Sequence, residues 1–186
     1  MRKDVVLPTI LPSIQNNLDL YEFLEKYDDK WVLLKIGDIN TLPSIIRKLH
    51  ANGTKVIVHQ DSIRGISADR SGVQFLANIG ADGIDTTKQR CISMIHETGA
   101  LAVVQLFVID SISVNTAIHV IQEGMPDYAI LMPSCIPSKV VKSIRERSKC
   151  SLLGGGMCSD RKDLDQILSN GMSGAVTSEK SLWHRK

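Results

Sequence analysis

The sequence predicts an α/β protein that folds as a small (β/α)8 barrel of the TIM type, with parallel strands. Short apolar runs alternate along the chain with segments whose apolar residues have helical spacing. A glycine follows most of these helical segments, in the position just past a helix end that glycine favours. The five units between Gly53 and Gly171 average about 24 residues, and eight such units nearly fill the 186 residues. We therefore expect a single domain over residues 1–186.

The first half of the chain is expected to supply four strand–helix units. Pro8 lies in the first expected strand and has to occupy a place where the sheet needs no backbone donor. Leu42, Ile45, Ile46 and Leu49 follow the i, i+3, i+4, i+7 pattern of an amphipathic helix. The elements expected here are strands over 5–12, 31–36, 56–58 and 81–85, and helices over 16–27, 42–49, 73–77 and 92–95.

The second half is expected to supply the other four units. The run at 100–108 is the most apolar strand, and Asp110-Ser111 after it is a good capping pair for the next helix. We expect Gly124 to close that helix. The elements expected here are strands over 100–108, 128–131, 152–153 and 175–176, and helices over 114–121, 136–148, 164–168 and 179–183.

The size of the chain leaves a second fold open. A (β/α)8 barrel usually needs about 200 residues or more, so the helices and loops have to be short. An open doubly wound sheet is the alternative, although such sheets usually have fewer strands and a clear reversal of strand order. In both folds the ligand binds at the carboxyl ends of the strands.

The composition limits the classes of protein to consider. Hydrophobic residues make up 43% of the chain, which is enough for a substantial core. The net charge is +2 and the basic residues are spread out, unlike the dense basic stripe of many nucleic-acid-binding domains. The four cysteines form no C-x-x-C pair. Since we find no signal peptide and no apolar run near 20 residues, we expect a cytoplasmic protein with reduced thiols that does not enter a membrane.

Two stretches late in the chain predict a phosphate pocket. Three consecutive glycines, 154–156, connect a short apolar run to a helical pattern, and a later run ends in Thr177-Ser178. Glycine lets a backbone approach a ligand closely, and unpaired N–H groups at helix starts favour an anion. The alternative interpretation is a tight strand-to-helix turn.

Three further residues stand out at or near strand ends. Asp61 could accept a ligand hydroxyl or act as a base, or it could cap a helix or turn. Lys88 could pair with a phosphate, or it could be a solvated lysine at a helix start, where a cation is slightly unfavourable. Gln105 lies in an apolar run; if it points into the barrel it needs hydrogen-bond partners, which a ligand could supply.

We expect neither a metal site nor a cofactor. His59 ends a strand without a second histidine nearby, so we interpret it as hydrogen-bonded to backbone rather than as a metal ligand. No arrangement of nucleophile, base and orienting group is visible.

Several blocks together resemble the glycerol uptake operon antiterminator family, and the resemblance covers nearly the whole chain in order. The blocks are Val58-His59-Gln60-Asp61 with Gly65-Ile66, Asp82-Gly83-Ile84 with Thr86-Thr87-Lys88, Gln105 to Ser111, Leu131-Met132-Pro133 with Ile136-Pro137, Gly154-Gly155-Gly156, and Thr177-Ser178 with Leu182-Trp183. Each block is weak alone, but their order and spacing are fairly specific.

The resemblance implies a small barrel that responds to glycerol 3-phosphate and acts on an mRNA leader to prevent termination. It implies a regulator of glycerol uptake and metabolism genes rather than an enzyme, and it does not decide whether the chain forms a homo-oligomer. The residues expected to bind the ligand are Asp61, Thr87, Lys88, Gln105, Ser134, Gly154, Gly155, Gly156, Thr177 and Ser178.

The sequence departs from the family pattern at a few positions. Val104-Gln105 stands where the family has Gln-Arg, and Ile130 stands where it has Glu. The Arg and the Glu are lost together, which a buried pair can tolerate structurally. Asp85 stands where the family leads us to expect an apolar residue. The phosphate blocks survive, so the resemblance supports phosphate recognition more directly than glycerol 3-phosphate or RNA.

Two other functions stay open. One is a small barrel enzyme for a phosphorylated three- to five-carbon substrate, with Asp61 or Lys88 in acid–base or Schiff-base roles; a phosphate beside Lys88 would raise its pKa and oppose Schiff-base chemistry. The other is a ligand-binding homologue without RNA binding. For RNA, the densest basic cluster is Lys139, Lys142, Arg145, Arg147 and Lys149, which could equally be a solvated helix face.

Overall fold

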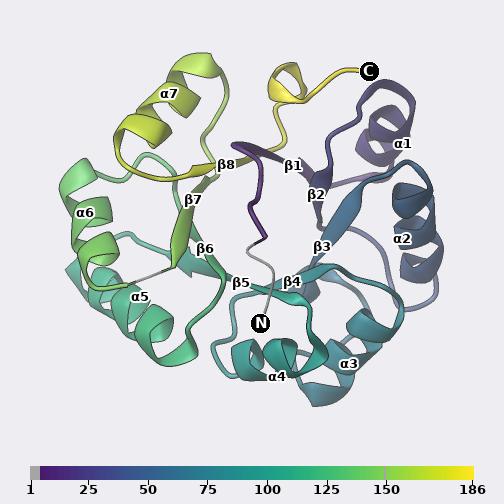
Figure 1. Cartoon of the computed structure of the whole chain (residues 1–186), viewed down its shortest axis with the longest axis horizontal. Helices are drawn as coiled ribbons and strands as arrows, with labels where there is room; N and C mark the ends of the chain where they lie inside the picture. The colour runs from purple at the N-terminus through teal and green to yellow at the C-terminus, as the bar shows by residue number, and fades with distance from the viewer. Residues whose placement is uncertain (1–4, 149) are drawn as a thin grey trace.

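The protein is an eight-stranded, all-parallel closed barrel surrounded by helices, so the predicted (β/α)8 fold is confirmed (Figure 1). The computed structural model describes residues 5–148 and 150–186; Lys149, one of the basic residues predicted to contact RNA, lies outside the described residues. Each strand pairs with its neighbours in chain order, and β8 returns to pair with β1.

The helices and strands alternate along the chain as the sequence predicts. The strands are β1 (Ile10–Ile14), β2 (Trp31–Leu34), β3 (Lys55–His59), β4 (Gly83–Thr86), β5 (Leu101–Phe107), β6 (Tyr128–Met132), β7 (Ser151–Gly155) and β8 (Gly174–Thr177). The helices are α1 (Asn17–Lys26), α2 (Leu42–Ala51), α3 (Arg70–Asn78), α4 (Cys91–Thr98), α5 (Ser111–Gly124), α6 (Ser138–Glu146) and α7 (Arg161–Ser169), with 3-10 turns η1 (Gln60–Ser62) and η2 (Lys180–Leu182).

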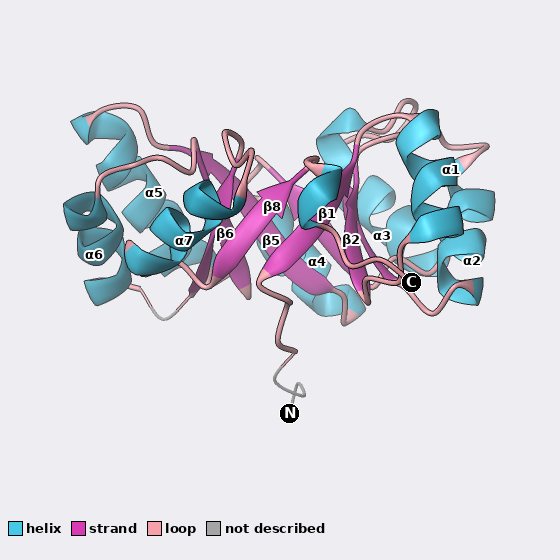
Figure 2. Cartoon of the chain, turned by 90° about the horizontal axis from the view of Figure 1, so that it is seen from above, coloured by secondary structure: helices cyan, strands magenta, loops and turns pink. Residues whose placement is uncertain are grey.

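Side chains on alternate strand positions form two separate cores. One fills the barrel and includes Leu33, Val103 and Leu153; the larger one lies between the sheet and the helices. This alternation decides which polar residues point inward, because residues two apart on a strand face the same side. The view from above shows the strands at the centre with helices on both sides (Figure 2).

The first strand begins later than the expected 5–12. Leu7 is buried with the interior core, and its backbone N–H donates to the hydroxyl of Tyr128 at 2.9 Å. The Tyr128 hydroxyl in turn donates to the carbonyl of Val5 at 3.0 Å. The segment before β1 therefore packs against the barrel interior instead of extending the sheet, and Pro8 stays outside the ladder.

The helix-closing glycines were predicted correctly in four places and wrongly in one. Gly53, Gly80, Gly99 and Gly171 all follow helices and have left-handed backbone angles. Gly124 is instead the last residue of α5, and the left-handed residue is Met125, with φ 48°. A Cβ on Gly124 would lie 2.5 Å from Cδ1 of Ile92, so a larger residue there would require the Ile92 side chain to shift.

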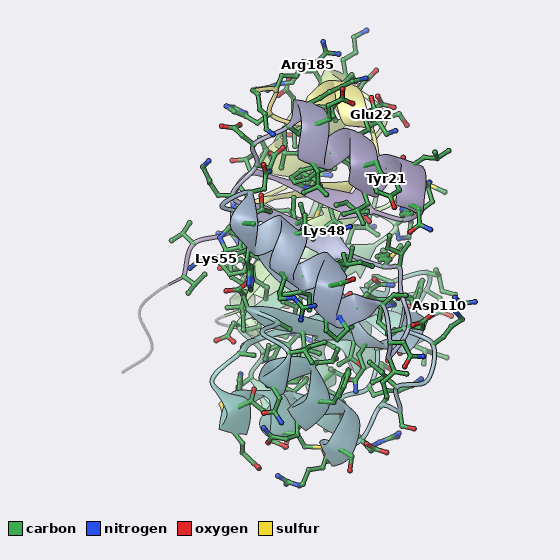
Figure 3. The ribbon with its side chains drawn as sticks, turned by 90° about the vertical axis from the view of Figure 1, so that its right-hand side faces the viewer. Tyr21, Glu22, Lys48, Lys55, Asp110 and Arg185 are labelled. Carbon is green, nitrogen blue, oxygen red and sulfur yellow. The ribbon has the colours of Figure 1, made fainter. Side chains whose placement is uncertain are left out.

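The two ends of the barrel are easily told apart. In Figure 3, Lys55, which begins β3, lies on one side of the molecule, and Asp110, which follows β5, lies on the opposite side. Asp110 accepts a hydrogen bond from the N–H of Ser113 and so caps α5, as predicted. The side marked by Asp110 is the mouth formed by the carboxyl ends of the strands.

The structure predicts that a side chain at position 155 of β7 would clash with β6. A Cβ on Gly155 would lie 2.6 Å from Cγ2 of Ile130, so we expect Gly155→Ala to reduce the free energy of unfolding by about 1–3 kcal/mol. In an Ile130→Ala background the same change should cost clearly less, because the conflicting methyl group is gone. Urea unfolding of the two single variants and the double variant measures this coupling; additive losses would contradict it.

Candidate functional site

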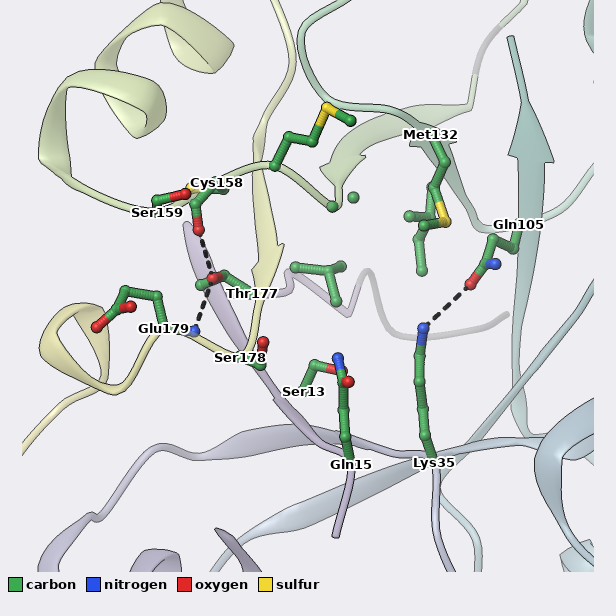
Figure 4. A pocket seen from close by; sticks show the side chains of 15 residues that line it. Ser13, Gln15, Lys35, Gln105, Met132, Cys158, Ser159, Thr177, Ser178 and Glu179 are labelled. Atoms are coloured by element: carbon green, nitrogen blue, oxygen red, sulfur yellow. Dashed lines mark hydrogen bonds between the residues drawn. The ribbon is translucent and has the colours of Figure 1, made fainter. Parts of the chain in front are cut away.

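A cavity of about 250 Å³ opens at the mouth of the barrel. Its lining comes from β1, β5, β6, β7 and β8 and from residues that directly follow β1, β2, β7 and β8 (Figure 4). Among the residues expected to bind a ligand, Gln105, Gly155, Gly156, Thr177 and Ser178 line it. The cavity is smaller than the roughly 300–1,000 Å³ of pockets for drug-sized molecules, which suits a metabolite of a few carbons.

Glycine is favoured at each of the three consecutive positions 154–156 for a different physical reason. Gly154 and Gly155 belong to β7, so the strand runs further than predicted. A Cβ on Gly154 would lie 2.9 Å from Cβ of Ser134, against the outer layer, whereas Gly155 faces Ile130 inside the barrel. Gly156 alone follows the strand; its φ is +70°, and a Cβ there would meet only the methyl group of Met132 at 3.4 Å.

The backbone beyond Gly156 presents unused donors to the cavity. Met157 has φ 54°, an uncommon left-handed conformation for a residue with a side chain. Among the described residues, the N–H groups of Gly156, Met157, Cys158 and Ser178 have no acceptor. Residues with unpaired backbone N–H groups, from two neighbouring loops, thus line one end of the cavity, where unpaired N–H groups favour an anion.

Thr177 joins these two loops. Its hydroxyl donates to the carbonyl of Cys158 at 2.8 Å and accepts from the N–H of Glu179 at 2.9 Å. Both bonds are drawn in Figure 4. Since its proton is used within the protein, Thr177 fixes the loop positions rather than offering a donor to a ligand. Ser178 is exposed at the cavity and keeps the role predicted for it.

Lys35 is a cavity residue that the sequence interpretation missed. It follows β2, and its ammonium group donates to Oε1 of Gln105 at 3.4 Å across the mouth (Figure 4). Lys35 was placed inside the expected strand 31–36 and was not considered as a ligand contact. The alternation of Trp31 and Leu33, which both face the interior, could have shown that Lys35 points inward as well.

Gln105 does point into the barrel, as the sequence suggested. It is 93% buried, and the register places it opposite Ile130 on β6. These are the two positions at which the family pattern has Arg and Glu. Their side chains face the same interior, so the joint replacement removes both members of a neighbouring pair, and Lys35 supplies the positive charge at this mouth.

Asp61 has a structural role in this fold. Its carboxylate accepts from the Thr86 hydroxyl at 2.9 Å and from the N–H and hydroxyl of Thr87 at 2.7 and 2.6 Å. Partial burial tends to raise the pKa of Asp61, but the hydrogen bonds from Thr87 and Thr86 outweigh it and lower the pKa. Asp61 therefore stays ionised and fastens η1 to the end of β4, which matches the capping alternative.

The remaining predicted ligand residues lie away from the cavity lining. Lys88 is exposed after β4, Thr87 is bound to Asp61, and Ser134 is buried behind Gly154. Their roles as ligand contacts stay predictions. Because Asp61 is bound to two threonines and Lys88 lies outside the cavity, the acid–base and Schiff-base roles suggested for them gain no support from this arrangement.

The interpretation of His59 as bonded to backbone was wrong. Its Nδ1 lies 2.6 Å from Oδ2 of Asp85, whose side chain is completely buried. The β3–β4 register pairs the two residues directly inside the barrel, which explains how a carboxylate can occupy this apolar place. The other oxygen of Asp85 has no partner among the described residues.

The predicted basic cluster lies on the outer surface, on and after α6. Lys139, Lys142 and Arg145 line a shallow groove of about 680 Å³ between α6 and α7. Arg147 points to a different groove, beside α5. Three of the four described basic residues of the cluster therefore share one surface. Lys142 also forms an ion pair with Glu146 at 3.8 Å.

Two further features are absent from the described residues. Within residues 5–148 and 150–186, no three His, Cys, Asp or Glu side chains are placed to hold a metal ion. In the same part of the chain, no helix is both long and apolar enough to span a membrane.

The fold and the cavity define a class of protein: a small (β/α)8 barrel whose polar pocket lies after β7 and β8, where such barrels often bind phosphate. A family model described as "Glycerol-3-phosphate responsive antiterminator" matches residues 10–183. The chain belongs to this family of glycerol-3-phosphate responsive antiterminators.

Two solved structures and one curated protein are similar to the chain over nearly its whole length. The crystal structure of a glycerol uptake operon antiterminator regulatory protein from Listeria monocytogenes superimposes with a TM-score of 0.90, at 27% identity over 98% of each chain. An antiterminator-related protein from Thermotoga maritima has a TM-score of 0.85 at 24% identity, covering 96% of this chain and 99% of its own. The uncharacterized protein YgcP of Escherichia coli is 25% identical over 94% of this chain and 91% of its own.

The hydrogen bonds of Asp61 predict that its replacement lowers the stability of the fold without changing ligand affinity. We expect Asp61→Asn to reduce the free energy of unfolding by about 1 kcal/mol, while the affinity for phosphate compounds stays unchanged. A lowered pKa in the folded state means that the stabilisation is present above the unfolded pKa and is lost as pH falls through the folded pKa. Urea unfolding between pH 3 and 7 should therefore show a weaker acid dependence in the variant; a loss of phosphate affinity would contradict the structural role.

Proposed function

We propose that the protein is a ligand-responsive regulator that binds a small phosphorylated metabolite at the barrel mouth and acts on an mRNA leader to prevent termination. Glycerol 3-phosphate, the compound that the family description names, is the first candidate ligand. The proposal places the protein in the cytoplasm, where it would meet both the metabolite and the transcript.

The phosphate half rests on the unused N–H groups of Gly156, Met157, Cys158 and Ser178. They come from two neighbouring loops that Thr177 holds together, so their directions are fixed before a ligand arrives. Fixed donors bind an anion with little ordering cost. Lys35 adds a positive charge to the same cavity, so the cavity as a whole favours an anionic ligand.

The RNA half rests on family membership and on the groove between α6 and α7. Lys139, Lys142 and Arg145 lie within reach of one another at helical spacing, and all three are exposed. A row of cations of this kind can follow a phosphate backbone. The proposal assigns RNA contact to this surface, which lies outside the barrel and separate from the ligand cavity.

The phosphate site can be tested at Gly156. A side chain there would extend into nearly open space at the cavity, so we expect Gly156→Val to reduce the affinity for glycerol 3-phosphate and inorganic phosphate at least tenfold. Isothermal titration calorimetry of parent and variant measures this change.

The control for the Gly156 test is Gly53→Val. Gly53 has φ +79°, with nothing within 4 Å of its Cβ position, and it lies after α2, away from the mouth. Both variants carry the same kind of backbone strain, about 1–2 kcal/mol, but only one alters the cavity. Equal phosphate affinity in the folded Gly156→Val variant and the parent would place the pocket elsewhere.

RNA contact can be tested by removing positive charges from the groove between α6 and α7. We expect Lys139→Ala with Lys142→Ala to weaken binding of the leader RNA and to reduce the slope of log affinity against log salt by about 1.4, the value for two lost single-strand contacts. Arg47→Ala with Lys48→Ala is the matched control, because it removes the same charge from the exposed face of α2. Filter binding at several salt concentrations is the measurement; equal slopes in both double variants would exclude this surface.

A further inference from the structure

Besides the unused backbone N–H groups, the cavity contains buried polar side chains whose hydrogen-bonding capacity is not fully used. Ser13 on β1 is 98% buried, lines the cavity, and has a hydroxyl oxygen without a partner among the described residues. Gln105 on β5 is 93% buried and lines the same cavity. Buried polar groups are nearly always hydrogen-bonded in native proteins, so the unpartnered hydroxyl of Ser13 indicates that a ligand completes the site.

The contact with Lys35 fixes the direction of the Gln105 amide. An ammonium group can only donate, so the oxygen of the amide has to face Lys35, as the 3.4 Å contact to Oε1 has it. The amide NH2 therefore points away from Lys35, and neither of its N–H groups has an acceptor among the described residues. Lys35 itself has two further N–H groups beyond the one that Gln105 accepts.

Three polar side chains, on β1, on β5 and just after β2, thus face the interior of the barrel at the same cavity. The β1–β2 register pairs Ser13 with Leu33, and Lys35 follows Leu33 by two residues, so both polar residues face the interior. Gln105 faces the same interior from β5, two residues after Val103. Figure 4 shows Lys35 and Gln105 on the side of the cavity away from Ser178 and Glu179, and Ser13 between Ser178 and Lys35.

The balance of donors and acceptors decides what chemical group fits. A neutral hydroxyl would leave the positive charge of Lys35 without a counter-ion, because the contact of Lys35 in the cavity is to the neutral amide of Gln105. Ile130 and Val176, which line the cavity between the two ends, have no polar side-chain atoms. A carboxylate brings no proton and accepts through two oxygens, which matches an ammonium, an amide NH2 and a hydroxyl.

No carboxylate of the described residues occupies the position beside Lys35 where the ligand carboxylate would bind. Glu179 lines the cavity on the β8 side, but its carboxylate accepts from the N–H of Ser181 at 3.1 Å, a bond that lowers its pKa. Asp85 is buried deeper in the barrel and is bound to His59 at 2.6 Å. Among the described residues that line the cavity, Lys35 is the only cation, and no carboxylate is bound to it.

We propose that Ser13, Lys35 and Gln105 form a carboxylate subsite, so that the ligand is a small phosphorylated hydroxy acid with its phosphate at the β7 and β8 loops. This inference rests on the phosphate pocket proposed above and names the other end of the same ligand. This ligand differs from a phosphorylated polyol at one carbon, where a carboxylate replaces a hydroxymethyl group.

The experiment compares two ligands that differ at this one carbon. Titration calorimetry of the parent protein with 3-phosphoglycerate and glycerol 3-phosphate should show at least about tenfold tighter binding of the acid, since charge-assisted hydrogen bonds are gained. Equal or weaker binding of 3-phosphoglycerate would overturn the carboxylate subsite. This comparison needs no variant, so it does not depend on whether a substitution folds.

Variants then assign the effect to residues. Lys35→Met and, separately, Gln105→Leu should abolish the preference for the acid while changing the affinity for inorganic phosphate less than about threefold. Lys48→Met is the matched control, because it removes a lysine from the exposed face of α2 that does not line the cavity; it should keep the preference. A Lys35→Met variant that loses inorganic phosphate binding would make Lys35 a phosphate ligand and overturn the assignment.

Two probes separate this inference from the proposed function. Glycerate carries the carboxylate alone and inorganic phosphate carries the other end. If phosphate compounds bind without a preference for the acid, only the carboxylate subsite fails. If glycerate binds in a Lys35-dependent way while no phosphate does, the subsite stands and the phosphate pocket fails; if neither binds, both are wrong.

Discussion

The barrel closes where β8 meets β1, and this closure depends on an approach that only glycine allows. A Cβ on Gly174 would lie 2.4 Å from the carbonyl oxygen of Thr9, which is a backbone atom that cannot move aside. The next residue, Ala175, donates its N–H to that same oxygen at 2.8 Å. Because this pairing brings the end of β8 beside β1, the loop with Ser178 faces Ser13 across a single cavity. In an open sheet the two groups would lie on different edges.

The residues after β8 hold this closure in place. The indole N–H of Trp183 donates to the carbonyl of Thr177 at 3.1 Å, and its ring packs edge-on against Phe23 and Tyr27. Lys180 binds the carboxylates of Asp19 and Glu22 on α1 at 2.8 and 2.6 Å. These contacts fasten the C-terminal segment to the first helix, so the position of the β8 loop is set from both sides.

Much of the fold could be predicted from the sequence, because helical spacing and closing glycines are local signals. The location of the mouth followed as well, since every parallel strand of a barrel ends on the same side. Local patterns did not show that the segment before β1 packs against the barrel interior, because that depends on Tyr128, far along the chain. Lys35 was missed because a lysine between apolar residues was interpreted as part of a strand rather than as an inward-facing group. The His59–Asp85 pair could not be predicted, because it needs the register between β3 and β4.

The central claim is that one cavity, closed by the β8–β1 contact, binds a phosphate group through backbone N–H groups. Two-dimensional NMR of the 15N-labelled protein during titration with glycerol 3-phosphate tests it most directly, because it reports on each N–H group separately. The account predicts saturable shifts concentrated at Gly156, Met157, Cys158 and Ser178. Shifts concentrated on α6, or no saturable shifts with any small phosphate, would contradict it.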